Sequence, residues 1–332
     1  MHILGTESLG VRGLSCYVEI DGHNILIDLG VALEYTRWGL HPHPLQAVVG
    51  DIVRSEIAKF WRIADYVVFT YMHGDHIPIY NANPFQLDLY VLDHNGEKKI
   101  IAPSPHILNT KEKTMLEKIR EIYREKLITI RWRAAERVQS KIYGSYPHSL
   151  SHSGVYAVYI DSDLSVLHLS DTGLLVEGII CLVRNIRPDI VVTDGPPIYR
   201  YMHDKGMVND LMARARQNLE RMISYADKVI IDHHINRCDE GYHWINSVRR
   251  EYSCIMTAAE YMGEKPLMLE SLRTTLYGLL PEDNYWFREH YRETLEKYRV
   301  ILRELITRIR NDMKQSNEAS FFLMLSKILA KK

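Results

Sequence analysis

Metal-competent side chains are concentrated in one short stretch of the sequence. Residues 68–78 read VFTYMHGDHIP, in which His73, Asp75 and His76 occupy three of four consecutive positions behind a β-like run. Imidazole and carboxylate ligands together suit zinc, iron or manganese, and this mixed donor set does not choose sharply among the three metals. The stretch therefore predicts a metal site just past the end of a buried strand.

Other residues of the same chemical types follow further apolar runs along the chain. They are Asp28, His148, Asp171, Asp194, Asp232, His233 and His234. In layered α/β folds the ends of several strands meet at one edge of the sheets, so positions far apart in the sequence can share one site. A lone histidine of this kind is more often a surface or core residue, and the prediction depends on the cluster at His73.

The elements that must position these residues alternate between strand-like and helical runs. LSCYVEI and NILIDLG flank the turn DGHN and predict a hairpin, and a helix over 47–62 leads into the strand DYVVFT. A charged helical pattern covers about 110–139. Beyond it come the hairpin runs VYAVYID and SVLHLSD, the helix LVEGIICLVRNI, the strand DIVVTD, a helix over 207–226 and the strand KVIID. This alternation predicts a layered α/β domain.

From about residue 266 onward the pattern is helical, and ASFFLMLSKILA forms a last amphipathic segment. This carboxy-terminal part is expected to cap the core or to serve as a dimerisation arm.

Composition excludes several classes of protein. Of the 332 residues 46% are hydrophobic and 25% charged, and the net charge of -1 gives no general case for binding nucleic acid, although a local basic patch stays possible. Four cysteines without a CxxC pair favour a reduced protein over a disulfide scaffold. The first ten residues lack the regions of a signal peptide, and no apolar run approaches the ~20 residues that span a bilayer. We expect a cytoplasmic protein without a membrane segment.

Five separated motifs resemble the metallo-β-lactamase superfamily in order and spacing: ILIDLG, TYMHGDH, YPHS, LSDTG and IIDHH. Within that superfamily, ESLGVRG, HPHPLQ, VVTDGPPIY and MTAAEYMGE are similar to an uncharacterised archaeal family of metal-dependent hydrolases, over residues 1 to about 275. The resemblance implies an αββα sandwich over 1–265. A helical extension over 266–332 would pack on it or make a homodimer.

The resemblance also implies two neighbouring metal positions. Asp75, His76 and His233 would hold one ion. His73 and His148 would hold the other, with Asp171 bridging both. His234 stays open as an alternative to His233. Zinc is expected, as one or two ions, with iron or manganese as alternatives. Asp28 resembles an aspartate that supports the ligand loop through hydrogen bonds.

Tyr71 departs from the superfamily pattern, because it stands where the first histidine of the ligand motif is expected. A phenol with a pKa of about 10 is a poor neutral ligand for zinc. Three outcomes stay open: one metal only, two metals of which one is labile, or a phenol that acts as an acid or positions the substrate. We expect single or unequal occupancy.

The chemistry that these residues permit is metal-assisted hydrolysis. A bound metal lowers the pKa of water from ~15.7 to about 7, and the resulting hydroxide would attack a phosphodiester or a carboxylic ester, lactone or amide. Asp75 and Asp171 would orient it, and His234, Asp194 or Tyr71 would supply acid chemistry. Phosphodiesters rank slightly first among substrates. The alternative is a catalytically degenerate, metal-stabilised binding or scaffold protein.

Overall fold

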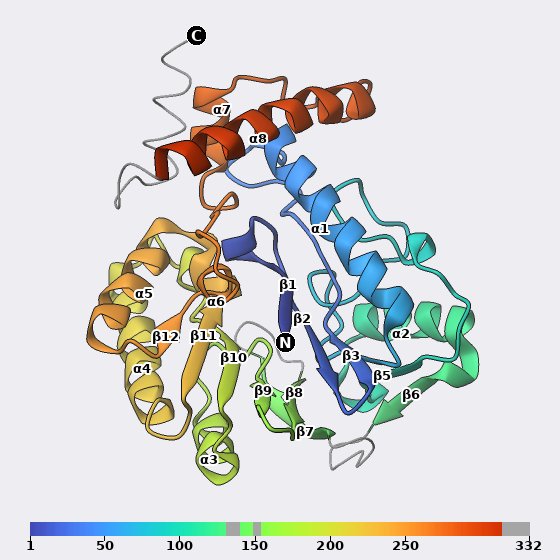
Figure 1. The fold of residues 1–332 in the computed structure, drawn as a ribbon, viewed down its shortest axis with the longest axis vertical. Coiled ribbons are helices and arrows are strands. Elements are labelled where there is room, and N and C mark those ends of the chain that lie inside the picture. Colours follow the sequence, from blue (N-terminus) through green and yellow to red (C-terminus); the bar gives the residue numbers. More distant parts are fainter. Residues whose placement is uncertain (131–139, 149–153, 314–332) are drawn as a thin grey trace.

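Two six-stranded sheets face each other in the structure, with helices on their outer sides (Figure 1). The structure is a computed structural model that describes residues 1–130, 140–148 and 154–313. The first sheet contains, in spatial order, β1 (His2–Thr6), β2 (Leu14–Ile20), β3 (His23–Ile27), β4 (Tyr66–Val68), β5 (Lys99–Pro103) and β6 (Leu127–Ile130). Strands β1 to β3 pair antiparallel, whereas β3 to β6 pair parallel.

The second sheet repeats this mixed arrangement in the opposite chain order. It contains β12 (Ile255–Met256), β11 (Lys228–Asp232), β10 (Ile190–Asp194), β9 (Val166–His168), β8 (Gly154–Ile160) and β7 (Ser140–Pro147). Strands β7 to β9 are antiparallel, and β9 to β12 are parallel. The predicted hairpin of VYAVYID and SVLHLSD is therefore confirmed.

Helices cover the outer face of each sheet. The first sheet carries α1 (Pro44–Ile63) and α2 (Thr110–Tyr123), and the second carries α3 (Glu177–Ile186), α4 (Lys205–Met222) and α5 (Asp239–Glu251). The chain continues through α6 (Ala258–Tyr261), α7 (Arg273–Leu279) and α8 (Tyr291–Met313). Short 3-10 helices include η1 (Glu7–Leu9), η5 (Ile198–Arg200) and η6 (His233–Arg237).

Three apolar layers hold this arrangement together. Between the sheets, Ile27 and Val68 of the first pack in one cluster with Val158, Val192 and Ile230 of the second. Separate clusters join each sheet to its own helices. Strands buried on both faces read as continuous apolar runs, which is why the runs were recognisable in the sequence. The predicted αββα sandwich is confirmed.

The carboxy-terminal helices extend the apolar cluster that joins α1 to the first sheet. Leu276 of α7 and Leu295 and Tyr298 of α8 are buried in the same cluster as Trp61 of α1, and Trp286 Nε1 donates to the Pro42 carbonyl at 3.0 Å. The boundary near residue 265 and the use of α8 in a dimer stay predictions. Among the helices in the described part of the chain, none has the length and apolar character that crossing a membrane requires.

One predicted element is wrong. The charged pattern over 110–139 predicted a single helical stretch, but α2 ends at Tyr123 and the chain turns through Arg124–Lys126 into β6. Arg124 has a φ of 47°, which ends the helical path, and the β-branched run of β6 then pairs with β5. Residues 131–139 and the amphipathic segment at 319–330 lie outside the described residues.

Candidate metal centre

The candidate site lies where strands of both sheets end at one edge. Asp28 follows β3, and Asp75 and His76 lie in the loop after β4. On the other sheet the residues are His148 after β7, Asp171 after β9, Asp194 at the end of β10, and His233 and His234 in η6 directly after β11. The fold thus brings together segments more than 150 residues apart in the sequence.

Asp171 is the centre of this arrangement. Its Oδ2 lies 3.0 Å from Nε2 of His76 and 3.2 Å from Nε2 of His148. The Nε2 of His234 is 3.7 Å from the same oxygen, and the Nε2 of His233 is 3.4 Å from Oδ1. Four imidazole nitrogens therefore face one carboxylate that is 1% exposed.

Three of these histidines are held from behind by a buried carboxylate on Nδ1. The pairs are His76 with Asp28 at 2.9 Å, His233 with Glu7 at 2.8 Å, and His234 with Asp194 at 2.7 Å. A carboxylate that accepts from Nδ1 fixes the tautomer and leaves the Nε2 lone pair to face the site. Metal-binding histidines in proteins are commonly held in this way.

The residues fit a metal ion by two further criteria. The ligand atoms of Asp75, His76 and His233 lie within 4.8 Å of one another, and so do those of Asp171, His233 and His234. The Oδ1 of Asp171 is buried and makes no hydrogen bond within the described residues. A buried carboxylate oxygen without a donor is costly unless a cation satisfies it. The His and Asp clusters can thus hold a metal ion. A mixed set of nitrogen and oxygen donors does not fix which metal that is.

Several buried ionisable groups of the site have shifted pKa values. Burial opposes ionisation of Asp171, but His76 and His233 hold the pKa of its carboxyl well below the usual range. Burial, together with the charge of Asp171, raises the pKa of Asp194 well above it. Although burial opposes it, Glu7 and Asp171 raise the pKa of His233 to about 10. The lowered pKa of Asp171 and the raised pKa of His233 both reflect the attraction between buried carboxylates and imidazoles.

Two predicted ligands, His73 and His148, are not members of the two metal-competent groups found among the described residues. The Nε2 of His73 lies 3.0 Å from the hydroxyl of Tyr71 and 3.5 Å from Oε1 of Glu112, and its side chain is 46% exposed. The buried Tyr71 ring packs 4.4 Å from that of His148. The role of His73 and His148 as ligands stays a prediction.

Asp28 and Asp194 hold the loops of the site in place. Asp28 accepts from the Thr70 amide at 2.7 Å and from the Thr70 hydroxyl, in addition to its contact with His76. These are the hydrogen bonds expected of it. Asp194 accepts from the Gly173 amide at 2.5 Å and contacts His234, and it is fully buried. Its position is that of a residue that orients His234.

Close backbone packing also shapes the ligand loop. The Gly30 amide donates to the His76 carbonyl at 2.9 Å, and a Cβ on Gly30 would lie only 2.4 Å from the amide nitrogen of His76. Asp28 and His233 both adopt left-handed backbone conformations, with φ of 49° and 65°. Such conformations in residues other than glycine cost energy and often occur at functional sites.

Sequence reasoning missed Arg237 and Tyr199 as residues of the site. Arg237 donates from Nε to Glu7 at 2.6 Å, from Nη1 to the Tyr199 hydroxyl at 3.0 Å and from Nη2 to Asp75 at 3.0 Å. The available signal was its place in IIDHHINR, four residues after His233. Tyr199 lies in the VVTDGPPIY motif but carries no sign that it would reach the site.

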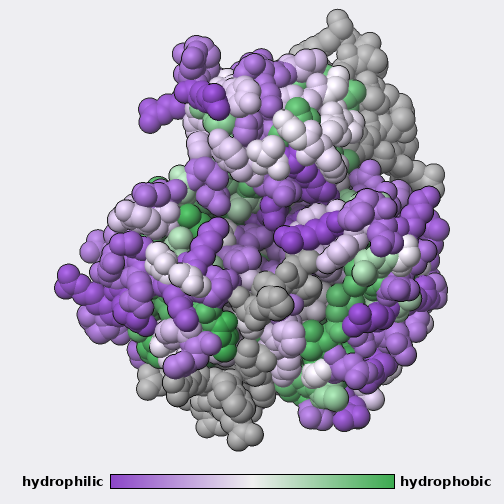
Figure 2. Space-filling view, turned by 180° about the vertical axis from the view of Figure 1, so that it is seen from behind, coloured by the Kyte–Doolittle hydropathy of each residue, from purple (hydrophilic) through white to green (hydrophobic). Residues whose placement is uncertain are grey.

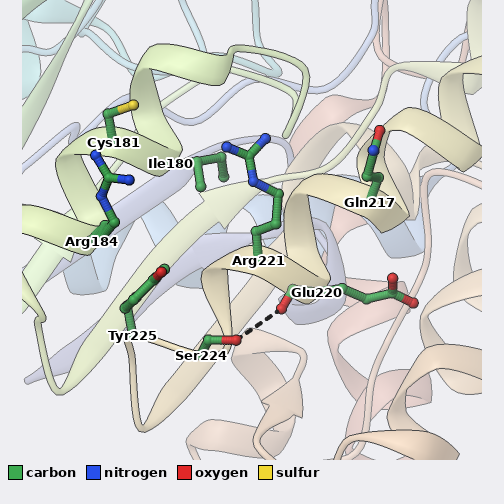
Figure 3. A pocket seen from close by; sticks show the side chains of 8 residues that line it. All are labelled: Ile180, Cys181, Arg184, Gln217, Glu220, Arg221, Ser224 and Tyr225. Carbon is green, nitrogen blue, oxygen red and sulfur yellow. Dashed lines mark hydrogen bonds between the residues drawn. The ribbon is translucent and has the colours of Figure 1, made fainter.

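A small cavity of about 90 Å³ opens onto this centre. Asp171 and His234 lie at its wall together with Arg12, Tyr199 and Arg200. The face seen in Figure 2 shows hydrophilic side chains around a hollow below the carboxy-terminal helices. A larger cavity of about 410 Å³ lies between α3 and α4, lined by Arg184, Arg221 and Tyr225 among others (Figure 3). None of the metal-competent groups found among the described residues lines this larger cavity, so the smaller cavity is the candidate site.

Comparison with known proteins gives clear relatives in sequence. The chain is 30% identical to the UPF0282 protein of Methanosarcina mazei over 295 residues, which cover 86% of this chain and 94% of that protein. It is also 30% identical to a UPF0282 protein of Pyrococcus horikoshii over 315 residues, covering 83% and 92%. No family model matches the chain.

Solved structures are more distantly similar. An isothiocyanate hydrolase from Delia radicum gut bacteria is 13% identical, with a TM-score of 0.45, and covers 74% of this chain and 94% of its own. A diphosphatase of the PhnP family is 15% identical, with a TM-score of 0.43, and covers 80% and 95%. The fold described above rests on the sheets and helices themselves.

Proposed function

We propose that this chain, which belongs to the UPF0282 family of archaeal proteins, is a metal-dependent hydrolase whose substrate carries a small anionic group. The observation that carries the proposal is the set of imidazoles, each held by a carboxylate on Nδ1, whose Nε2 atoms face Asp171 at the wall of a cavity. A purely structural core has no need of so many buried charges, because burying them is costly.

Zinc is the metal that we propose first, with iron or manganese as alternatives, because imidazole and carboxylate donors suit all three. Asp171 and the imidazoles that face it would hold an ion, and Asp75, His76 and His233 form the other group whose spacing could hold one. When bound, such an ion acidifies water and polarises the oxygen under attack.

Cationic side chains at the cavity support a phosphodiester as the first choice of substrate. Arg12, Arg200 and Arg237 line it together with Tyr199. Guanidinium groups bind phosphate oxygens through paired hydrogen bonds, and they bind carboxylates in the same way. A carboxylic ester, lactone or amide that carries an acidic group therefore ranks second.

Tyr199 is a candidate proton donor to the leaving group. Its hydroxyl accepts from Arg237 at 3.0 Å and from Arg200 at 3.4 Å, so its own hydrogen is directed elsewhere. Burial opposes ionisation of this phenol, but Arg237 and Arg12 offset that effect and lower its pKa. A donor of reduced pKa transfers its proton more readily near neutral pH. His234 remains a second candidate, and Tyr71, which contacts His73 and His148, is a third.

The direct test is turnover by protein loaded with zinc, manganese or iron. We expect hydrolysis of bis(p-nitrophenyl) phosphate to exceed hydrolysis of p-nitrophenyl esters and lactones. Asp171→Asn should abolish it, whereas Asp163→Asn, at an exposed position, should retain it. Full metal binding without turnover of any substrate would instead support the catalytically degenerate scaffold.

A further inference from the structure

The guanidinium group of Arg237 lies inside one of the two metal-competent groups. Its Nη2 is 3.0 Å from Oδ2 of Asp75. The same nitrogen lies over the His233 ring, 3.0 Å from Nε2 and 3.3 Å from Nδ1. Those two ligand atoms are 3.7 Å apart. A positively charged nitrogen therefore already contacts both atoms that would hold an ion at the Asp75 side of the centre.

The distances leave little room for a metal at that position. Ligand bonds to zinc are about 2.0–2.2 Å long, so an ion bound by both atoms would lie within about 3.4 Å of Nη2 wherever it sat between them. A dication and a permanent guanidinium cation repel strongly at such a separation in a buried site.

Arg237 is not a side chain that can readily move away. It is 1% exposed, and its other two nitrogens donate to Glu7 at 2.6 Å and to the Tyr199 hydroxyl at 3.0 Å. Displacing it would leave the carboxylates of Glu7 and Asp75 buried without their shared cation. Breaking a buried ion pair in this way is strongly unfavourable.

The surroundings of Asp171 differ from those of Asp75. In the described part of the chain, the groups in contact with the Asp171 carboxylate are imidazoles, and no arginine nitrogen lies within hydrogen-bonding distance of it. Its Oδ1 makes no hydrogen bond, while the Nε2 atoms of His76, His148 and His234 face its Oδ2. Asp75 is thus in contact with a guanidinium group, whereas Asp171 is surrounded by imidazoles, which are themselves metal ligands in proteins.

We propose that the chain binds a single metal ion at Asp171, on the side where the Nε2 atoms of His76, His148 and His234 face its Oδ2. The Arg237 guanidinium takes the place of a second ion between Asp75 and His233. This inference rests on the proposed metal-dependent function. It makes Asp75 a partner of Arg237 and a positioning residue, whereas the sequence alone favoured Asp75, His76 and His233 as the intact metal position.

Metal stoichiometry tests the inference without any substrate. Metal-free protein is titrated with Mn²⁺, the bound ions are counted by elemental analysis, and the electron paramagnetic resonance spectrum distinguishes an isolated ion from a spin-coupled pair. We expect about one ion per chain with the signal of an isolated ion. Arg237→Ala should admit a second ion and produce a coupled pair, whereas Arg12→Ala, which removes the other arginine near Asp75, should stay at one.

Asp75→Asn provides a second measurement that does not depend on the folding of the Arg237 variant. We expect it to keep one ion with an affinity within about threefold of the wild type, because its carboxylate is not a ligand. Two ions in the wild type, loss of an ion in Asp75→Asn, or a folded Arg237→Ala variant that still binds one ion would each overturn the inference. Wild-type protein that binds no metal would refute the proposed function itself.

Discussion

The Nε2 of His76 lies 3.0 Å from Oδ2 of Asp171, although the two residues are 95 positions apart and follow strands of different sheets. His76 belongs to the loop after β4 in the first sheet, and Asp171 follows β9 in the second. An ion bound by both would join the two halves of the sandwich. The unfolded chain would offer the ion no comparable site, so metal binding would increase the free energy of unfolding.

We therefore expect zinc removal to lower the melting temperature. At an ion concentration 100-fold above the dissociation constant, binding stabilises the native state by about 2.7 kcal/mol, which corresponds to a shift of several degrees. Thermal unfolding with zinc and with a chelator measures the difference. Asp171→Asn should unfold at the same temperature in both conditions, and a variant that still responds to zinc would contradict the placement of the ion.

Gly30→Ala should damage the site through the backbone. The added Cβ would lie 2.4 Å from the amide nitrogens of His76 and Ile77, so the ligand loop must shift. We expect a loss of about 1–3 kcal/mol in unfolding free energy, the usual range for overpacking, and weaker metal binding. The control is Gly278→Ala in α7, where a Cβ meets nothing within 4 Å. Equal effects of the two substitutions would argue against a strained loop.

Tyr71→Phe tests whether the hydroxyl of this tyrosine takes part in metal binding. The hydroxyl of Tyr71 contacts His73, which lies outside both metal-competent groups. We expect the affinity for metal, measured by calorimetry, to change less than about threefold, while the ring continues to fill its buried position. A loss of metal binding comparable to that of Asp171→Asn would instead make the phenol part of the ligand set.

The stability of the protein should depend on pH through His43, at the start of α1. Its Nδ1 accepts from the Leu45 amide at 3.2 Å and its Nε2 donates to the Leu280 carbonyl at 2.8 Å. Burial lowers its pKa to about 4. Below pH 6.5 the His43 imidazole binds a proton in the unfolded chain but stays neutral in the native protein. The stabilisation that is present above pH 6.5 is therefore lost as the pH falls towards 4.

The size of this effect is up to about 3 kcal/mol across that interval. His43→Asn keeps an acceptor at the helix cap without a titrating ring, so its unfolding free energy should fall less between pH 6.5 and 4. Denaturant unfolding at several pH values measures the slopes. His290→Asn, at an exposed position, should leave the slope unchanged, and identical slopes for His43→Asn and wild type would exclude His43 as the cause.

The strands that carry the candidate ligands were predictable because they are buried on both faces. The cores of β10 and β11, IVV and VII, are apolar, and the strands end in Asp194 and Asp232, which marks the edge of the sheet in the sequence itself. The end of α2 was not predictable in the same way. The residues after Tyr123 are charged and fit a helical pattern, and only pairing with β5 makes 127–130 a strand.

The place of Arg237 shows where sequence reasoning stops. The position of Arg237, four residues after His233, was visible in the sequence. However, η6 is a 3-10 helix, and the orientation of the Arg237 side chain depends on the packing of η1 against η6. Glu7 of η1 reaches both His233 and Arg237 from the other end of the chain. Such a contact is set by the complete fold and has no local signature.

The division of the ligands between the sheets has a consequence for protein synthesis. A ribosome that has made only the first sheet has produced Asp75 and His76 but neither Asp171 nor His234, which enter the chain later. The emerging polypeptide therefore has no complete set of donors for most of translation. An ion held by donors from both sheets would then be captured late, and metal content would report that both halves of the chain have docked.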